Sequence, residues 1–157
     1  MPNWSEGVLK IRGRNTDIIS FLKYGIYAVN YLGEKREIET YLSTAGTIDL
    51  LVDDNSWFYV KGTTRGFINT NEINLWYNNL YDENILCLSY KQAWSINANE
   101  LALISKLYNL DIKVYSYEFG MEFNQDIEIA RGGNIIQDKT ITFNNYQWEC
   151  TNPTLGG

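Results

Sequence analysis

The stretch Ile96-Asn97-Ala98-Asn99-Glu100-Leu101 has the features of a helix start and is the clearest structural signal in this chain. The side chain of Asn97 can accept from the amide of the third helical residue, and Glu100 can reach back to the amide of Asn97. Ile96 and Leu101 have the spacing of a hydrophobic staple. Apolar residues then recur on one stripe, at Leu101, Ile104, Leu107 and Tyr108. The sequence therefore predicts a helix that begins at Asn97 and packs this stripe on a sheet.

The residues after this helix predict strands joined by tight turns. Asn109 is placed to end the helix, and residues 112–118 have the mixture of β-branched and aromatic side chains that is typical of a strand. Residues 119–122 read as a turn into a strand over 123–131, where Gly132-Gly133 predicts a hairpin. A last strand is predicted over residues 140–148.

The residues before the helix predict a strand, a helix and more strands. A strand over residues 4–12 ends at Gly13, and the next helix can be capped by Asn15 or Thr16 and stopped by Gly25.

The middle of the chain is richer in strand signals. Residues 34–39 fit a helical turn or a loop, and both readings stay open. Residues 47–71 predict a meander of three short strands, residues 71–83 have a weak helical period, and residues 84–91 read as a strand.

Two parts of the chain resemble a known family. They are Met1-Pro2-Asn3-Trp4-Ser5-Glu6 with Leu9-Lys10-Ile11-Arg12-Gly13, and Ala93-Trp94-Ser95 with Tyr115-Ser116-Tyr117-Glu118-Phe119-Gly120-Met121-Glu122-Phe123. Both resemble the YubB-type ferredoxin-like domain proteins of phages, plasmids and pathogenicity islands. The resemblance implies an α+β fold, a ferredoxin-like sandwich whose mostly antiparallel sheet has two main helices on one face. It also implies an origin in a mobile genetic element, and it supplies no catalytic residues.

Length and composition point to one globular domain without familiar catalytic groups. The 157 residues predict a single domain over residues 1–150 and a flexible tail over residues 151–157. The chain has no histidine, which removes the commonest general base and metal ligand. We therefore expect a protein that is not an enzyme and has no cofactor.

The two cysteines and the hydropathy pattern bear on the compartment. Cys87 and Cys150 cannot make a disulfide framework or, without histidine, a four-ligand zinc site. The sequence shows no secretory signal and no run of roughly 18 apolar residues. We expect a cytoplasmic protein of the host cell.

Carboxylates gather in several segments. In residues 126–129, Asp126 and Glu128 are predicted on one strand face and Ile127 and Ile129 in the core, and Glu122 could join the acidic face across a turn. The spacing does not match a calcium loop, so we expect no metal site. A solvated strand face and a partner surface both remain open interpretations.

The net charge of −6 suggests how an acidic surface could function. Acids interleaved with tyrosines can imitate a nucleic acid toward a protein with a basic groove. The predicted partner-binding residues are Asp53, Asp54, Asp82, Glu83, Tyr81, Glu122, Asp126 and Glu128. The alternative interpretation is an ordinary solubilising surface.

A third possibility comes from the aromatic residues. The five tryptophans are expected mostly in the core, yet aromatic side chains on a sheet can also stack RNA bases. Residues 61–67 are the nearest approach to the aromatic motif of RNA-recognition modules, although the match is incomplete.

The leading hypothesis is a non-catalytic phage or mobile-element accessory protein that binds a host protein. We expect the partner to be a nucleic-acid-binding defence effector, inhibited as by an anti-CRISPR protein. The alternatives are an RNA- or DNA-binding module that uses the ferredoxin-like sheet and a metal-dependent enzyme that uses carboxylates alone. The negative charge argues against direct nucleic-acid binding.

Overall fold

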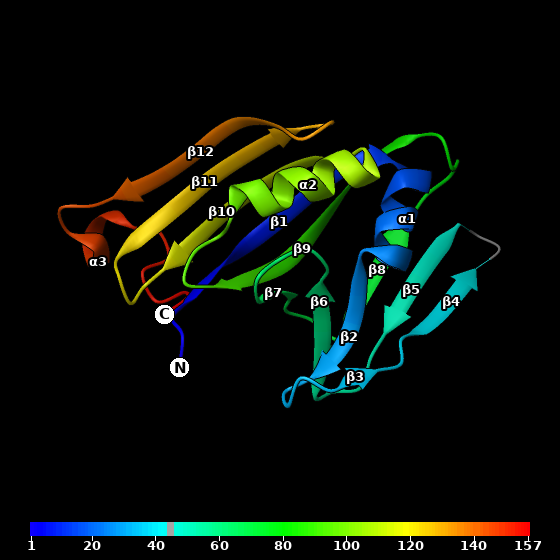
Figure 1. Cartoon of the computed structure of the whole chain (residues 1–157), viewed down its shortest axis with the longest axis horizontal. Coiled ribbons are helices and arrows are strands. Elements are labelled where there is room, and N and C mark those ends of the chain that lie inside the picture. Colours follow the sequence, from blue (N-terminus) through cyan, green and yellow to red (C-terminus); the bar gives the residue numbers. More distant parts are fainter. Residues whose placement is uncertain (44–45) are drawn as a thin grey trace.

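The computed structural model describes residues 1–43 and 46–157, which form two antiparallel sheets and three helices (Figure 1). The large sheet has nine strands, in the spatial order β12 (Asn134–Thr142), β11 (Phe123–Ala130), β10 (Asp111–Glu118), β1 (Trp4–Arg14), β9 (Glu83–Ala93), β7 (Gly66–Ile68), β6 (Ser56–Val60), β2 (Ile26–Asn30) and β3 (Lys35–Arg36). The small sheet has the order β4 (Glu39–Ser43), β5 (Thr47–Leu51) and β8 (Glu72–Trp76).

Two helices cover one face of the large sheet. α1 (Asn15–Tyr24) packs on β1, β2 and β9, and α2 (Ala98–Tyr108) packs on β10, β11 and β12 (Figure 1). α1 also faces β5 of the small sheet, where Leu22 lies near Ile48 and Leu50. The apolar core therefore lies between this face and the helices, and Leu9 and Leu101 are almost fully buried in it. α3 (Tyr146–Glu149) is one turn near the C-terminus.

The prediction of a ferredoxin-like sandwich with two main helices is wrong. Strands make up 49% of the chain and helices 16%, and the helices are short. The difference arises in residues 26–76, which extend the large sheet by β2, β3, β6 and β7 and also build the small sheet. These strands join their sheets through partners distant in sequence, as when Phe67 of β7 pairs with Lys91 of β9. Local sequence patterns do not specify such pairings.

The helix predicted at Asn97 is confirmed as α2. The Asn97 side chain accepts from the amides of Asn99 and Glu100, as expected for a cap. Leu101 and Ile104 are buried, but Leu107 is 73% exposed and lies outside the packed stripe. The strand predicted over residues 112–118 is also confirmed, as β10.

Glu100 differs from its predicted role in a capping box. Its carboxylate accepts from the amide and hydroxyl of Thr64 and from the side chain of Gln92. The amide of Asn97 donates to Gln92 as well. The carboxylate therefore links α2 to the β6–β7 turn, a tertiary contact that the local motif could not reveal.

Other local predictions are mixed. The strands of residues 47–71 exist, but β5 belongs to the small sheet and β6 and β7 to the large one. The weak helical period over residues 71–83 is wrong, because β8 occupies its first half. Residues 140–148 divide between the end of β12 and α3. α1 begins without a side-chain cap bond, and Asn15 instead donates to the carbonyl of Asn79.

The C-terminal residues return to the start of the chain. The amide of Gly157 donates to the carbonyl of Trp4 at 2.8 Å. The hydroxyls of Tyr117 and Thr151 lie 3.3 Å apart. Residues 151–157, predicted as a flexible tail, therefore contact β1 and β10.

Candidate functional site

The two faces of the large sheet differ in chemistry. In β1, Leu9 and Ile11 are buried under the helices, whereas Trp4, Glu6 and Val8 point the other way. We call this second side, over β2, β6, β7, β9, β1 and β10, the open face. Alternation along each strand decides which side chains reach it.

One row of side chains crosses the open face from strand to strand. Its members lie directly opposite one another in the register of six neighbouring strands. We call it the cross-strand row, and it consists of Tyr27, Tyr59, Phe67, Lys91, Glu6 and Tyr117. Side chains in such positions are near enough to pack laterally. Four of the six members are aromatic, so the row presents mainly ring surfaces.

The rings of the row and two flanking tryptophans pack against each other. Tyr27 and Tyr59 are stacked, with centroids 5.1 Å apart and an interplanar angle of 27°. Phe67 makes edge contacts with Tyr59 at 5.1 Å, Trp4 at 5.9 Å and Trp57 at 6.1 Å. All five rings remain partly exposed. They form a cluster that keeps ring surface available to a ligand.

Cations lie over the two indoles. The Nζ atom of Lys91 is 4.9 Å from the ring centroid of Trp4 and 5.0 Å from that of Trp57. The guanidinium of Arg65 is 5.6 Å from the ring of Trp4. Burial lowers the pKa of Lys91, and the nearby carboxylate of Glu6 partly opposes this shift. Lys91 is therefore a partly desolvated cation held by aromatic rings.

A turn positions Arg65. The hydroxyl of Thr63 donates to the carbonyl of Val60 at 2.6 Å, and the hydroxyl of Tyr59 donates to the carbonyl of Thr63 at 2.6 Å. The amide of Arg65 donates to the hydroxyl of Tyr59 at 3.2 Å. Arg65 has a left-handed backbone with φ of 55°, which carries the chain directly into β7. The turn thus holds the backbone of Arg65 where its guanidinium can reach the ring of Trp4.

Together these residues line a groove, which we call the aromatic groove. Its lining consists of Trp4, Tyr27, Val29, Asn30, Tyr31, Gly33, Trp57, Tyr59, Arg65, Phe67 and Lys91. Among these described residues only Arg65 and Lys91 are charged, and both are cations. The indole N–H of Trp57 is buried and has no hydrogen-bond partner in the described chain. The groove therefore offers ring faces and positive charge, a combination suited to binding planar anions.

Asp53 and Asp54 lie in a different place, in the turn between β5 and β6. Asp53 accepts from the hydroxyl of Ser56 at 2.6 Å and lies 4.0 Å from the guanidinium of Arg36. The side chain of Asn71 donates to Asp54. This part of the surface also contains Glu37, Glu39 and Glu72.

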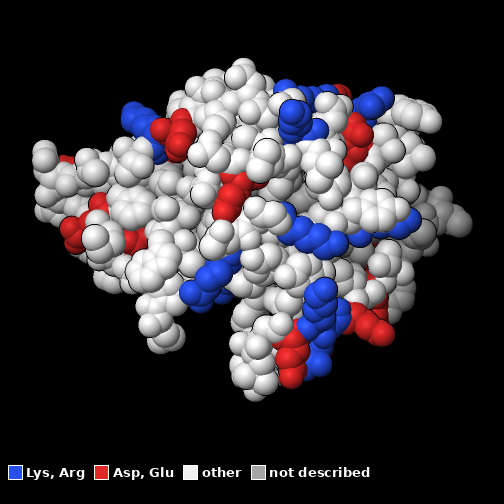
Figure 2. Space-filling view, viewed as in Figure 1, with Lys and Arg blue, Asp and Glu red and all other residues white. Residues whose placement is uncertain are grey.

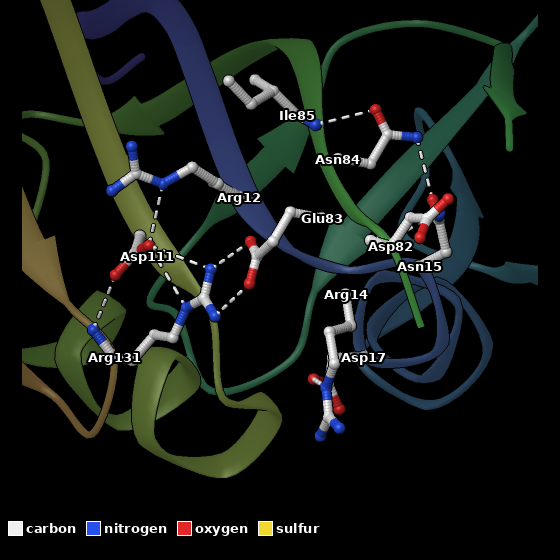
Figure 3. Close-up of polar contacts among 10 residues, drawn as sticks. All are labelled: Arg12, Arg14, Asn15, Asp17, Asp82, Glu83, Asn84, Ile85, Asp111 and Arg131. Carbon is white, nitrogen blue, oxygen red and sulfur yellow. Dashed lines mark hydrogen bonds and ion pairs between the residues drawn. The ribbon is translucent and has the colours of Figure 1, made fainter. Parts of the chain in front are cut away.

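The predicted residues Tyr81, Asp82 and Glu83 precede and begin β9. The carboxylate of Glu83 is held by the guanidinium of Arg131, which also bonds Asp111 (Figure 3). The hydrogen bond from Arg131 lowers the pKa of Glu83. Asp82 accepts at its backbone carbonyl from the amide of Asn15, and Tyr81 is 72% exposed. Glu83 is thus committed to an internal ion-pair cluster.

The remaining predicted acids lie on and beside β11. Asp126 and Glu128 are partly exposed, and Ile127 and Ile129 are buried, as the alternation predicted. Glu122 occupies the turn between β10 and β11 with φ of 58°.

The eight predicted residues therefore lie in three separate places, and the structure does not gather them into one patch. On the face drawn in Figure 2, acidic side chains are interspersed with basic ones. A partner surface made of these residues stays a prediction.

The aromatic groove was only partly visible in the sequence. Trp4 and Trp57 were expected in the core, but both line the groove. The segment 61–67 did carry a signal, because Arg65 and Phe67 reach the open face. The alternation of Trp57 and Tyr59 around buried Phe58 could have placed two rings on one face of the strand. It could not have shown which strands lie beside them.

Comparisons with protein-family models, curated proteins and solved structures find no match to this chain. No helix in the described ranges is long and apolar enough to cross a bilayer. Within the same ranges, no three His, Cys, Asp or Glu side chains are grouped to hold a metal ion. The chemistry of the aromatic groove is therefore the main guide to function.

Proposed function

We propose that this protein is a non-catalytic binder of single-stranded nucleic acid whose bases stack in the aromatic groove. The observation that carries the proposal is the charge of the groove. In a chain of net charge −6, the described lining contains two cations and no carboxylate. An anionic, planar ligand is the class that this local chemistry favours.

Stacking accounts for the preference for single strands. Base stacking on an aromatic side chain contributes about 1–3 kcal/mol per base and tolerates any base. In a duplex the base faces are covered by neighbouring pairs, whereas unpaired bases can be splayed onto a protein surface. The rings of Trp4, Trp57 and Tyr27 supply such a surface, and Arg65 and Lys91 can bind phosphate or stack on a base.

The overall negative charge limits the strength of this binding without excluding it. Phosphates are repelled by the carboxylates elsewhere on the surface, so few backbone contacts can form. We therefore expect affinity to come mainly from stacking, with a shallow dependence on salt. A protein that relied on many phosphate contacts would show a steep one.

Fluorescence anisotropy with labelled oligonucleotides tests the proposal. Single-stranded RNA, single-stranded DNA and the matching duplexes are titrated with wild-type protein and with Trp57→Ala and Tyr27→Ala. We expect single strands to bind better than duplexes and each substitution to weaken binding by about ten-fold or more. The arms with RNA and DNA show which strand is preferred.

Two other tryptophans give matched controls. Trp76 is 73% exposed on the small sheet and Trp148 is 86% exposed in α3. Trp76→Ala and Trp148→Ala should leave binding unchanged, and thermal melts confirm that all four variants fold. Equal losses from groove and control variants, or no binding by the wild type at low salt, would overturn the proposal.

A second candidate function is the binding of a protein partner through the acidic surface around Asp53 and Asp54. Asp53 and Asp54 share one region with Glu37 and Glu72, and this favours a protein partner with a basic groove. Capture from a nuclease-treated host lysate tests it, with Asp53→Lys and Asp54→Lys combined in one variant. The captured protein should be lost from this variant. Capture that survives the charge reversal would rule out this site.

A further inference from the structure

A second groove lies beside the aromatic groove on the open face. It runs over β9, β1 and β10, which are neighbours in the large sheet (Figure 1). Its lining includes Val8, Lys10, Cys87, Ser89, Tyr115 and Tyr117. Tyr115 and Tyr117 contact each other with centroids 5.3 Å apart. We call it the tyrosine groove; like the aromatic groove it presents ring surfaces and a lysine, but its lining also contains the carboxylate of Glu6.

The two grooves meet at one cross-strand pair. Lys91 lines the aromatic groove, Glu6 lines the tyrosine groove, and the two residues are directly opposite in the register of β9 and β1. Tyr117 is the next member of the cross-strand row. The row therefore passes from one groove into the other without leaving the open face.

Two lysines lie beside the tyrosine groove, and their like charges face each other across neighbouring strands. Lys10 of β1 is directly opposite Lys113 of β10, and both are exposed. Neither has a carboxylate within ion-pair distance among the described residues, although Glu128 lies opposite Lys113 on its other side. Like charges directly opposite each other destabilise a sheet. An anion bound between the two lysines would relieve that repulsion.

We infer that one extended strand of nucleic acid crosses both grooves, with bases on the tyrosine pair and a phosphate at Lys10 and Lys113. This inference rests on the proposed function and gives the ligand a length. Six strands separated by about 4.8 Å make the row about 24 Å long. A nucleotide spans about 3.4 Å in a base-stacked strand and more in an extended one, so at most about seven nucleotides cover the row and a dinucleotide is too short to do so. The ligand is therefore an oligonucleotide strand and not a single nucleotide.

The chain contains a natural reporter for the tyrosine groove. Cys87 is exposed, lines this groove and is directly opposite Lys10, whereas Cys150 is buried. A maleimide should therefore react at Cys87 first. The rate of this reaction reports whether a ligand covers the tyrosine groove, independently of binding in the aromatic groove.

The experiment compares a dinucleotide with an oligodeoxythymidylate of about eight nucleotides. Each is added at saturation, and the rate of Cys87 alkylation by N-ethylmaleimide is measured by mass spectrometry. We expect the longer strand to slow alkylation by about ten-fold and the dinucleotide to leave it unchanged. Cys87→Ser should abolish the rapid reaction, which confirms the assignment of the thiol.

Affinity supplies the second readout. The double variant Lys10→Gln and Lys113→Gln should weaken binding of the longer strand by about ten-fold and that of the dinucleotide little. Lys106→Gln is the matched control, because Lys106 is an exposed lysine of α2 on the opposite face. Glu6→Gln should strengthen binding of the longer strand by about two-fold or more, since it removes the carboxylate beside the ligand path.

The outcomes separate this inference from the proposed function. If the longer strand binds, depends on Trp57 and leaves Cys87 fully reactive, the continuous path is wrong and the aromatic groove stands. Equal effects of the Lys10/Lys113 variant and the Lys106 control also contradict the path. If neither ligand binds, the proposed function fails as well.

Discussion

The helix-covered face and the open face of the large sheet are built from the same strands but from different side chains. In β6, Phe58 and Val60 are fully buried under the helices, whereas Trp57 and Tyr59 are partly exposed on the other side. The covered face is mostly aliphatic, and the open face between β2 and β10 is mostly aromatic and polar. Neighbouring residues in one strand can thus serve stability and recognition separately.

The difference shows how burial and chemistry are matched. Aliphatic side chains stabilise a protein most when water is fully excluded from them. Aromatic rings retain useful faces while their edges pack on neighbours, as the contacts of Phe67 do. The open face can therefore be stable and still leave surface for a ligand.

The largest expected effect comes from two adjacent residues of β1. Leu9 is 2% exposed on the covered face, and Val8 is 45% exposed on the open face. Leu9→Ala should lower the free energy of unfolding by about 2–5 kcal/mol because it leaves a cavity. Val8→Ala should lower it by about 1 kcal/mol or less. Urea denaturation measures both, and similar losses would mean that the two faces do not differ in their contribution to stability.

Lys91 provides a test in which binding and stability should separate. Lys91→Met removes a half-buried charge but keeps a long apolar side chain against Trp4 and Trp57. Affinity for a single strand should fall by about ten-fold, because one charge-assisted contact is lost. The melting temperature should stay the same or rise, since the desolvated charge is gone. A clear loss of stability would assign Lys91 to the structure and not to the ligand.

The lowered pKa of Lys91 predicts a pH dependence of binding. Burial moves this pKa below its usual value, so the free protein loses the proton earlier on the alkaline side than an exposed lysine does. Affinity for an anionic strand should be full below that pKa and fall as pH rises through it. The unfolded chain holds the proton more tightly, so the same group favours folding as pH rises from the folded to the unfolded value.

Anisotropy across alkaline pH measures this effect. Oligodeoxyadenylate is the suitable probe because adenine does not lose a proton in this range. Lys91→Arg keeps the positive charge and should flatten the pH profile. An unchanged profile in Lys91→Arg would show that another group, such as Tyr27 with its pKa raised by burial and by Tyr59, causes the dependence.

The smallest expected effect belongs to the ion-pair cluster at the end of β9. Arg131 bonds Glu83 and Asp111, whose pKa values are both lowered (Figure 3). For Glu83 the hydrogen bond from Arg131 is the main cause. For Asp111, burial raises the pKa, but the hydrogen bonds from Arg131 and Arg12 lower it by more. Both carboxylates therefore stabilise the fold above their unfolded pKa values.

This stabilisation is lost as pH falls through the lowered folded values. Because these side chains are partly exposed, Arg131→Met should cost about 1 kcal/mol or less at neutral pH. This loss of unfolding free energy should disappear when urea denaturation is measured at a pH below the folded-state pKa values of Glu83 and Asp111. Lys106→Met is the control at both pH values. A cost that persists in acid would show that packing of the Arg131 side chain, and not its charge, matters.

The sequence predicted the parts of the fold that depend on near neighbours. The Asn97 cap, the buried positions Ile127 and Ile129, and the Gly132-Gly133 turn all follow from backbone geometry within a few residues. The sequence-based prediction was wrong where the structure depends on contacts between residues far apart in the chain. Residues 72–76 form a strand because β5 supplies hydrogen-bonding partners, and Glu100 bonds Thr64 instead of its own helix start.

The sequence by itself determined which residues alternate within each strand, and so that Trp57 and Tyr59 share one face. Only the tertiary structure decided that Trp4, Tyr27 and Phe67 join them, because those residues come from three other strands whose partners are distant in the chain, as Ala93 is from Trp4. Alternation is a property of one strand's geometry, whereas register between distant strands depends on the whole packed core. The aromatic groove depends on the register between distant strands. For that reason composition alone indicated an acidic protein and did not reveal a groove with positive charge.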